Sequence, residues 1–279
     1  MSRRVAAVIK GFINLATLPI NERQKVKTLA RISEYISQQG AKTIKTPKGD
    51  LKFYALRGSG MASAVERFGK DEPETLEWID NFVKSGDVLW DIGANIGMYA
   101  MYAALNPQVK VMAFEPSALN YGLLIEHLAL NKMDKTVSPL CVALGNKTEI
   151  ASLEMSSLET GHAGNTIGES KNQFREYQSV FSQTVPAMTA EDFCKIFNQP
   201  TPDHIKLDVD GIEPFIIEGA KAILPKVKTV IIEVEGKNLE NVAELIEKPL
   251  FAAGFEEDKA YRSKGECRNR VYINKSLVK

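Results

Sequence analysis

From residue 73 onward, short apolar runs alternate with amphipathic segments, and this rhythm restricts the folds open to the chain. Apolar runs typical of buried strands lie at residues 87–91, 109–114, 137–144, 204–209 and 229–234. Segments with helical spacing lie at residues 73–83, 96–105, 118–131, 189–197, 213–224 and 239–248. Strands that alternate with helices pair in parallel, so the pattern predicts a doubly wound α/β sheet.

The end of the chain breaks this rhythm. Alternating residues at 255–261 and 270–273 flank a Lys264-Gly265 turn, which predicts a terminal hairpin and an antiparallel edge. With the five strands above, we expect a mostly parallel sheet of seven strands. Residues 150–155 predict an additional strand. Residues 156–182, rich in glycine, serine and asparagine, predict a long loop of the kind that often serves function.

The first seventy residues have a different character. Residues 5–38 show helical spacing with a break at Leu18-Pro19, which predicts two helices with basic outer faces. Two alternating runs between residues 43 and 54 predict a hairpin around Pro47 to Asp50. We therefore expect a helical and hairpin extension over residues 1–70 and an α/β domain over residues 71–279.

Charge is balanced over the whole chain but not along it. The 35 Lys and Arg residues equal the 35 Asp and Glu residues, so no overall field draws the protein to nucleic acid. Residues 1–50, however, carry ten basic and three acidic residues. This asymmetry leaves several interpretations open for residues 1–40: a weak contact with a membrane surface, an acidic partner, a homodimer contact, or helices that lie on an acidic body.

The cysteines and the apolar segments indicate where in the cell the protein is located. The chain has three cysteines, which lie far apart: Cys141, Cys194 and Cys267. An odd and widely spaced set forms no disulfide framework and no Cys-x-x-Cys metal pair. The apolar stretch at residues 5–18 is interrupted by Lys10 and Asn14, and no run is long enough to span a bilayer. We expect a cytoplasmic protein with reduced thiols and no transmembrane segment.

The strongest local signal is a glycine turn after the first of these strands. The strand ends at Asp91, the turn contains Gly93 and Gly97, and a helix follows. Glycines allow close approach of a ligand, and the helix N-terminus offers unpaired N–H groups. Glu115 ends the next strand, close to the spacing at which an acid binds a ribose diol.

This turn departs from the dinucleotide-binding pattern G-x-G-x-x-G. Gly93 and Gly97 stand four residues apart, and no third glycine is present to hold a pyrophosphate. An acid before the turn suits a ligand with a positive amino group. These features together predict S-adenosylmethionine as the cofactor, with an NAD-dependent oxidoreductase as the alternative.

A second signal lies at the end of the fourth strand. Asp208, Asp210 and Glu213 fall within six residues there and would face the same crevice as Asp91 and Glu115. Asp208 is the first candidate to contact an acceptor hydroxyl, whereas Glu213 has an alternative role as a helix cap. Lys206, in the middle of the strand, needs a partner, and an ion pair is the simplest one.

Four motifs in this order resemble the FkbM family of S-adenosylmethionine-dependent methyltransferases. They are Glu72-Pro-Glu-Thr-Leu-Glu-Trp-Ile, Asp-Ile-Gly-Ala-Asn-Ile-Gly (91–97), Ala-Phe-Glu-Pro-Ser (113–117) and Ile-Lys-Leu-Asp-Val-Asp-Gly-Ile-Glu (205–213). The resemblance covers residues 72–235 and implies a Rossmann-like class I methyltransferase fold. It also implies O-methylation of a hydroxyl on a sugar, glycan, polyketide or similar small molecule. Asp210 is a departure, since the family usually reads Asp-Val-Glu-Gly.

The resemblance also implies the cofactor-binding residues. They are Asp91, Gly93, Ala94, Asn95 and Gly97 from the glycine turn, and Glu115, Pro116 and Ser117 from the end of the next strand.

A neutral hydroxyl is a weak nucleophile, so methyl transfer benefits from a base. Asp208 is the first candidate, Asp210 the second, and His162, on the long loop, the third. A divalent metal held by Asp208, Asp210 and either Glu233 or Glu235 is a less favoured option, and without a His/Cys cluster zinc is not expected.

Two points stay open at this level. The first is whether the fold serves a non-catalytic scaffold that binds S-adenosylmethionine. The second is the acceptor, which the N-terminal segment and the loops at 156–182 and 236–239 would define.

Overall fold

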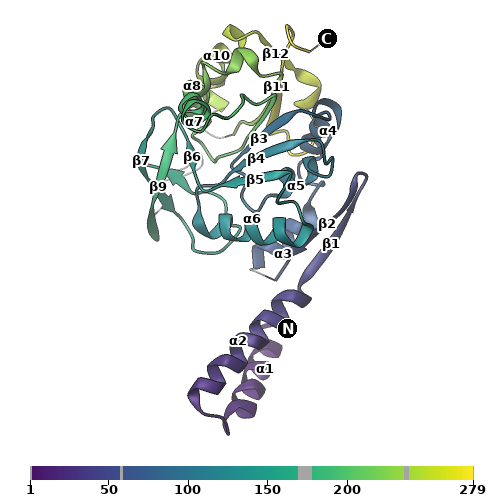
Figure 1. Cartoon of the computed structure of the whole chain (residues 1–279), viewed down its shortest axis with the longest axis vertical. Coiled ribbons are helices and arrows are strands. Elements are labelled where there is room, and N and C mark those ends of the chain that lie inside the picture. The colour runs from purple at the N-terminus through teal and green to yellow at the C-terminus, as the bar shows by residue number, and fades with distance from the viewer. Residues whose placement is uncertain (1, 57–58, 169–177, 236–238, 279) are drawn as a thin grey trace.

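The computed structural model describes residues 2–56, 59–168, 178–235 and 239–278. Its central sheet has seven strands in the order β12-β13-β11-β10-β3-β4-β5 (Figure 1). These strands are β3 (Val88–Ile92), β4 (Lys110–Phe114), β5 (Val137–Leu140), β10 (His204–Leu207), β11 (Thr229–Glu233), β12 (Phe255–Asp258) and β13 (Asn269–Asn274). β13 runs antiparallel to its neighbours β11 and β12, and the remaining neighbours pair in parallel. The predicted doubly wound, mostly parallel seven-stranded sheet is confirmed.

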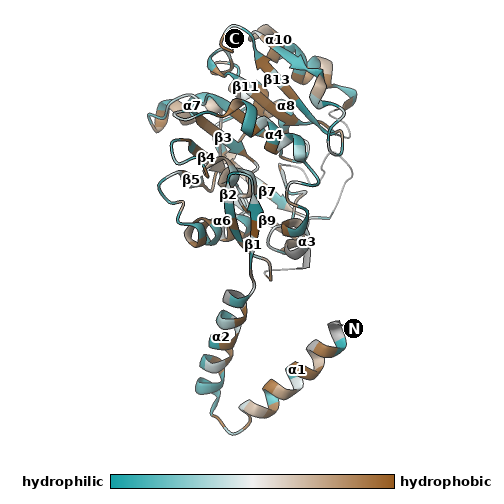
Figure 2. Cartoon of the chain, turned by 90° about the vertical axis from the view of Figure 1, so that its right-hand side faces the viewer, coloured by the Kyte–Doolittle hydropathy of each residue, from teal (hydrophilic) through white to brown (hydrophobic). Residues whose placement is uncertain are grey.

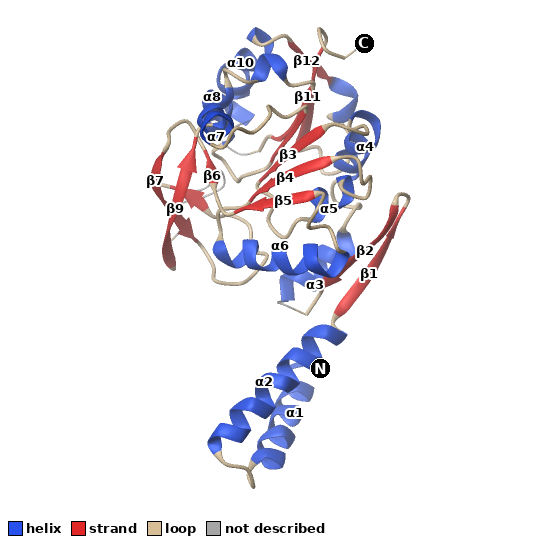
Figure 3. Ribbon diagram, viewed as in Figure 1, coloured by secondary structure: helices blue, strands red, loops and turns tan. Residues whose placement is uncertain are grey.

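The strands are apolar on both faces because helices cover both (Figure 3). Along β3, Leu89 packs on one side with α5 and Trp90 on the other with Phe193 of α7. The first face carries α4 (Pro73–Phe82), α5 (Met98–Ala103) and α6 (Ala118–Asn131). The second carries α7 (Ala190–Ile196), α8 (Glu213–Ala220) and α10 (Lys248–Ala252). Short turns of helix complete the body: η1 (Leu224–Lys226), η2 (Ala243–Glu247) and η3 (Lys259–Tyr261).

The direction of sheet growth reverses between β3 and β10. From β3 the sheet grows through β4 to β5 on one side, and from β10 through β11 on the other. The loops after β3 and β10 therefore leave in opposite directions and open a crevice at the carboxyl ends of the strands.

A second, four-stranded sheet corrects part of the predicted layout. Its order is β6-β9-β7-β8, with β6 (Ala143–Leu144), β7 (Glu149–Met155), β8 (Thr166–Ile167) and β9 (Phe181–Met188). The prediction of one strand over residues 137–144 was wrong, since the chain leaves the main sheet after Leu140 and β6 joins the small sheet. The additional strand near residue 150 is confirmed as β7. The predicted long loop contains β8 and the start of β9, and residues 169–177 of it lie outside the described residues.

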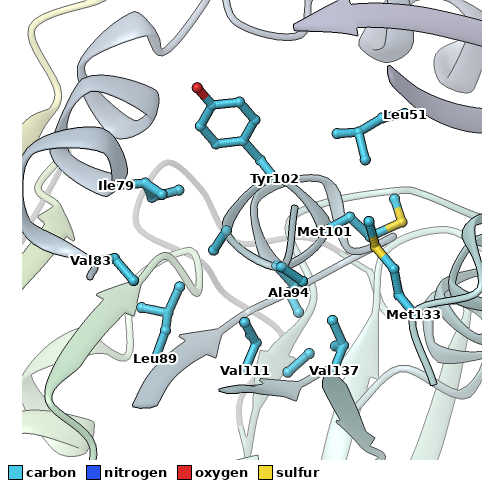
Figure 4. Close-up of a cluster of buried hydrophobic side chains, with 14 of the residues drawn as sticks. Leu51, Ile79, Val83, Leu89, Ala94, Met101, Tyr102, Val111, Met133 and Val137 are labelled. Atoms are coloured by element: carbon cyan, nitrogen blue, oxygen red, sulfur yellow. The ribbon is translucent and has the colours of Figure 1, made fainter. Parts of the chain in front are cut away.

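The two predicted N-terminal helices and the hairpin are also confirmed. They are α1 (Ser2–Thr17), α2 (Glu22–Gln39), β1 (Ala41–Thr46) and β2 (Gly49–Tyr54), followed by α3 (Ser59–Arg67), which was not predicted. The hairpin packs on the body, because Leu51 and Phe53 are fully buried in the same core as Met101 and Tyr102 (Figure 4). α1 and α2 instead extend away from the body, so the interpretation that these helices lie on an acidic body is wrong (Figure 2). The domain boundary near residue 70 stays a prediction.

Among the described residues, no helix is both long and apolar enough to cross a bilayer.

Candidate active site

The glycine turn after β3 is fixed by contacts with both neighbouring strands. Gly93 has a φ of +79°, and a Cβ atom there would lie 1.8 Å from the carbonyl oxygen of Asp208 at the end of β10. The N–H groups of Gly93 and Ala94 both donate to the carbonyl oxygen of Phe114, at 3.0 Å. A glycine is required at this position because both the backbone conformation and the available space exclude a side chain.

Asn95 continues the turn in a left-handed conformation, with a φ of 49°, and Gly97 caps α5. The Asn95 N–H donates to Glu115 Oε2 at 2.8 Å. Its side-chain Oδ1 is buried and has no hydrogen-bond partner among the described residues. A buried acceptor without a partner is costly, so this oxygen is suited to receive a donor from a ligand.

Glu115, directly after β4, is 6% exposed and lies against the glycine turn. Its Oε1 accepts a hydrogen bond from the Ser117 N–H and its Oε2 one from the Asn95 N–H, both at 2.8 Å. Burial raises the pKa of Glu115 to about 7, and these backbone hydrogen bonds offset only part of that rise. Each oxygen keeps a second lone pair for a ligand hydroxyl.

Two hollows open at this end of the sheet and share Gly93, Asn95 and Asp208. The polar residues that line the first hollow are Asn95, Glu115, Asn120, His162, Asn165, Asp208 and Asp210, and its apolar wall includes Phe114, Val142, Leu144, Leu153 and Ile216. The second hollow is lined by Arg67, Phe68, Asp71, Glu72, Met98, Tyr99, Lys206 and Arg268 together with the turn.

The segment at residues 159–167 covers the first hollow. Asn120 of α6 anchors it, since its Oδ1 accepts from the Gly161 N–H at 2.7 Å and its Nδ2 donates to the His162 carbonyl oxygen at 3.0 Å. The His162 ring is held by a hydrogen bond of 2.9 Å between Nε2 and Ser156 Oγ. The predicted loop histidine therefore lies in the wall of the hollow.

Asp210 and Glu213 follow β10 on the side of the first hollow. Asp210 Oδ2 accepts from the Gly164 N–H at 2.6 Å, and burial together with the charge of Asp208 raises the pKa of Asp210 to about 6. Glu213 is fully buried at the start of α8, where its Oε1 accepts from the Val209 N–H at 3.2 Å. Burial also raises the pKa of Glu213 to about 7. Glu213 stands in the first turn of α8, where a carboxylate is favourable, but the N–H in this contact belongs to Val209 in the preceding loop, so the role of Glu213 as a helix cap stays a prediction.

Lys206 lines the second hollow. It forms the ion pair that is expected of a buried lysine in β10. Its Nζ lies 3.0 Å from Asp208 Oδ2, 3.7 Å from Asp91 Oδ1 and 5.0 Å from the centre of the Tyr99 ring. Burial by itself would lower the pKa of Lys206, but Asp208, Asp91 and Glu72 outweigh it and raise the pKa. Burial likewise favours protonation of Asp208, yet the charge of Lys206 holds the pKa of Asp208 below its usual value.

Asp91 lies behind the turn, and the lining of neither hollow includes it. It is 1% exposed, and burial raises the pKa of its carboxyl group. Its nearest charge partner is Lys206, whose Nζ lies 3.7 Å from Asp91 Oδ1 and offsets part of this rise.

Arg268 lies beside Glu233 and Glu235, two acids of the predicted metal-ligand set. Its guanidinium group forms ion pairs with Glu233 at 2.9 Å, Glu235 at 2.9 Å and Glu266 at 2.6 Å. Burial and the negative charge of Asp208 raise the pKa of Glu233. Within the described parts of the chain, no group of three or more His, Cys, Asp or Glu side chains is arranged to hold a metal ion.

The structure thus brings most of the predicted residues to one crevice. Of the eight residues predicted to bind the cofactor, five line one or both hollows: Gly93, Ala94, Asn95, Glu115 and Pro116. Asp91, Gly97 and Ser117 line neither, and Ser117 caps α6 by accepting from the Asn120 N–H at 3.5 Å. The three predicted base candidates all line the first hollow, and Asp208 also lines the second.

Sequence reasoning missed five polar residues that line the second hollow: Arg67, Asp71, Glu72, Tyr99 and Arg268. Glu72 opens one of the four family motifs and accepts a hydrogen bond from Tyr99, the second residue of α5, so both stand beside segments already singled out. No sequence motif indicates a functional role for Arg268, which stands in the terminal segment. It comes close to Glu233 and Glu235 only because β13 pairs with β11.

An open sheet with this strand order, a glycine turn at the point where the order reverses and an acid after the next strand define the class of S-adenosylmethionine-dependent methyltransferases. Comparison with known proteins agrees. A family model described as the methyltransferase FkbM domain matches residues 91–262. The chain belongs to the FkbM methyltransferase family.

The individual proteins that the chain resembles are also methyltransferases. The chain is similar to the hexuronic acid methyltransferase AglP of Haloferax volcanii, with 26% identity over 79% of this chain and 88% of the relative. It is also similar to the 31-O-demethyl-FK506 methyltransferase FkbM of Streptomyces tacrolimicus, with 38% identity over 19% of this chain and 22% of the relative. Among solved structures, precorrin-6y C5,15-methyltransferase from Geobacter metallireducens covers 72% of this chain and 84% of its own, with 16% identity and a TM-score of 0.41. That last likeness is too distant to carry an argument. None of these relatives supports the oxidoreductase alternative.

Proposed function

We propose that this methyltransferase transfers the methyl group of S-adenosylmethionine to a hydroxyl of a sugar, glycan or polyketide-type small molecule. The observation that carries the proposal is the junction of the two hollows at Gly93, Asn95 and Asp208. A cofactor in the first hollow and an acceptor in the second would meet there. The likeness to AglP, whose name specifies a hexuronic acid, supports a sugar-type acceptor.

The residues of the first hollow fit the cofactor. The carboxyl group of Glu115 has free lone pairs for two ribose hydroxyls, and Asn95 Oδ1 is a buried acceptor that no donor among the described residues reaches. The apolar wall at Phe114, Val142 and Leu144 suits a base ring. Bound in this way, S-adenosylmethionine would supply an electrophilic methyl group on a positively charged sulfur.

Asp208 is the residue we propose to accept the hydrogen bond of the acceptor hydroxyl. It lines both hollows, and its ion pair with Lys206 keeps it ionised. An ionised carboxylate at this junction would orient the hydroxyl oxygen and receive its proton as the methyl group passes from sulfur to that oxygen. Asp210 and His162 are the alternatives, and both lie on the side of the first hollow.

The side chains do not favour a divalent metal in this reaction. Arg268 already pairs with Glu233 and Glu235, the two acids that would have to join Asp208 and Asp210 in a ligand set. We propose a cytoplasmic location, with support from three free cysteines.

The test is Asp208→Asn, assayed for methyl transfer to uronic acids and other sugars. We expect kcat to fall by about 10²–10⁴-fold while S-adenosylmethionine still binds in calorimetry. The pH profile of kcat separates the candidates. Asp208, with its lowered pKa, gives a flat profile from pH 5 to 9, whereas a limb near pH 6 would assign the role to Asp210. Absence of cofactor binding by the unmodified enzyme would refute the proposed function.

A further inference from the structure

The two N-terminal helices, α1 and α2, form an arm that extends away from the methyltransferase body (Figure 2). Five large apolar side chains of α1 are exposed, by between 52% and 73%: Val5, Val8, Ile9, Phe12 and Leu15. Neither α2 nor the body covers them. Since a soluble surface seldom leaves such a row of side chains in water, the row marks an interaction surface.

These side chains share one face of α1. Their spacings of three and four residues place them within an arc of about 120° of a helix with 100° per residue. Lys10 and Asn14, both exposed, lie on the opposite side. α1 is therefore amphipathic, with an apolar face that none of the described residues covers.

The arm is also strongly basic. Residues 2–39 contain seven basic and two acidic residues, a net charge of +5, whereas the remainder of the chain has a net charge of −5. The basic residues are Arg3, Arg4, Lys10, Arg23, Lys25, Lys27 and Arg31. Two arms of like charge repel each other, which disfavours an arm-to-arm contact between two copies of this chain.

We propose that this arm docks the enzyme on the surface of an anionic lipid bilayer, with the apolar face of α1 buried at the headgroup boundary. α1 has 16 residues and a length of about 24 Å, which is too short to span a bilayer of about 30 Å but suits a helix that lies in the interface. Apolar burial and basic charge are the two signals that together give stable binding at a membrane surface. The proposal does not depend on the identity of the methyl acceptor.

The test is sedimentation of the full chain with vesicles of phosphatidylcholine alone or with added phosphatidylglycerol. We expect binding only to the vesicles that contain phosphatidylglycerol, and we expect high salt to weaken it. Phe12→Glu should lower the partition coefficient about a hundredfold, because it removes a buried ring and adds a negative charge. Asn14→Glu is the matched control, which adds the same charge on the opposite face and should cost only about fivefold.

Both variants should keep methyl transfer to a soluble acceptor and their melting temperature, since neither residue touches the body. Equal losses for Phe12→Glu and Asn14→Glu, or equal binding to both kinds of vesicle, would overturn the proposal. An enzyme that binds no vesicle, but forms a dimer in light scattering that Phe12→Glu dissociates, would also overturn it and would assign the face to a second copy.

Discussion

The two hollows meet at the same glycine turn but differ in how they hold buried carboxyl groups. In the first, Glu115 and Asp210 are held by backbone N–H groups, and no Lys or Arg is among the described residues that line it. In the second, Asp208 faces the buried ammonium group of Lys206. Burial raises the pKa values of both carboxyl groups in the first hollow. In the second hollow the charge of Lys206 outweighs burial and lowers the pKa of Asp208, whereas burial still raises the pKa of Glu72.

This difference matches the division of labour that we propose. Among the described residues, the carboxyl groups of the first hollow have no cation beside them. A positively charged cofactor would stabilise their ionised forms. A hollow with a fixed ion pair keeps its carboxylate charged whatever binds. The carboxylate is therefore always available to accept a hydrogen bond from a hydroxyl, and the lowered pKa that keeps it charged also makes it a weaker base. Substitutions of Lys206, Glu115 and Asp210 each remove one of the charged groups on which this difference depends.

The largest effect is expected for Lys206→Met. Removal of the ammonium group leaves the buried carboxyl groups of Asp91 and Asp208 without their cation, and breaking such a pair costs about 3–5 kcal/mol of unfolding free energy. Urea denaturation measures this. The control is Lys195→Met, which removes an exposed ion pair with Glu191 and should leave the urea midpoint nearly unchanged. Equal effects of the two variants would show that Lys206 is not the ion that balances this hollow.

An intermediate effect is expected for Glu115→Gln. Hydrogen bonds to a charged group contribute about 1.5–3 kcal/mol, so S-adenosylmethionine affinity should fall about 10–100-fold in calorimetry. Gln also replaces one of the two acceptor oxygens with an NH2 group, so either the Asn95 or the Ser117 N–H loses its acceptor, and the melting temperature of the free variant checks that the turn stays folded. Unchanged affinity would remove Glu115 from the proposed cofactor site. Glu191→Gln, on the surface of α7, is the control for loss of a charge elsewhere.

The smallest effect concerns the pH dependence of stability. Since burial raises the pKa of Asp210 from 3.8 to about 6, the folded state binds this proton more tightly than the unfolded state does. Its contribution to stability is present below pH 4 and is lost as the pH rises to 6, by about 1 kcal/mol between pH 5 and 6. Asp210→Asn should remove this slope from urea midpoints measured at the two pH values. A slope that is the same in the variant and the unmodified enzyme would contradict the assignment. Asp208→Asn should show the opposite sign, with an effect only in more acidic solution, where the Lys206 pair breaks.

The sequence by itself determined the features that depend on local pattern. The alternation of strands and helices predicted the doubly wound sheet, since periodicity reports which side of each element is buried. The glycines of the turn and the acid after the next strand predicted a cofactor crevice, because both follow directly from the ends of predicted strands. The N-terminal helices and hairpin were equally local and equally predictable.

The tertiary structure alone decided which distant groups meet. Nothing near Leu140 shows that the chain will leave the main sheet there, and β9 contains Pro186 and exposed residues that hide its strand character. Arg268 reaches Glu233 only because β13 pairs with β11, and Lys206 faces Asp91 only because β10 pairs with β3. Local periodicity encodes burial, whereas the partners of a buried charge are set by strand pairing between segments far apart in the chain, and for that reason the charge balance of the site became visible only in the fold.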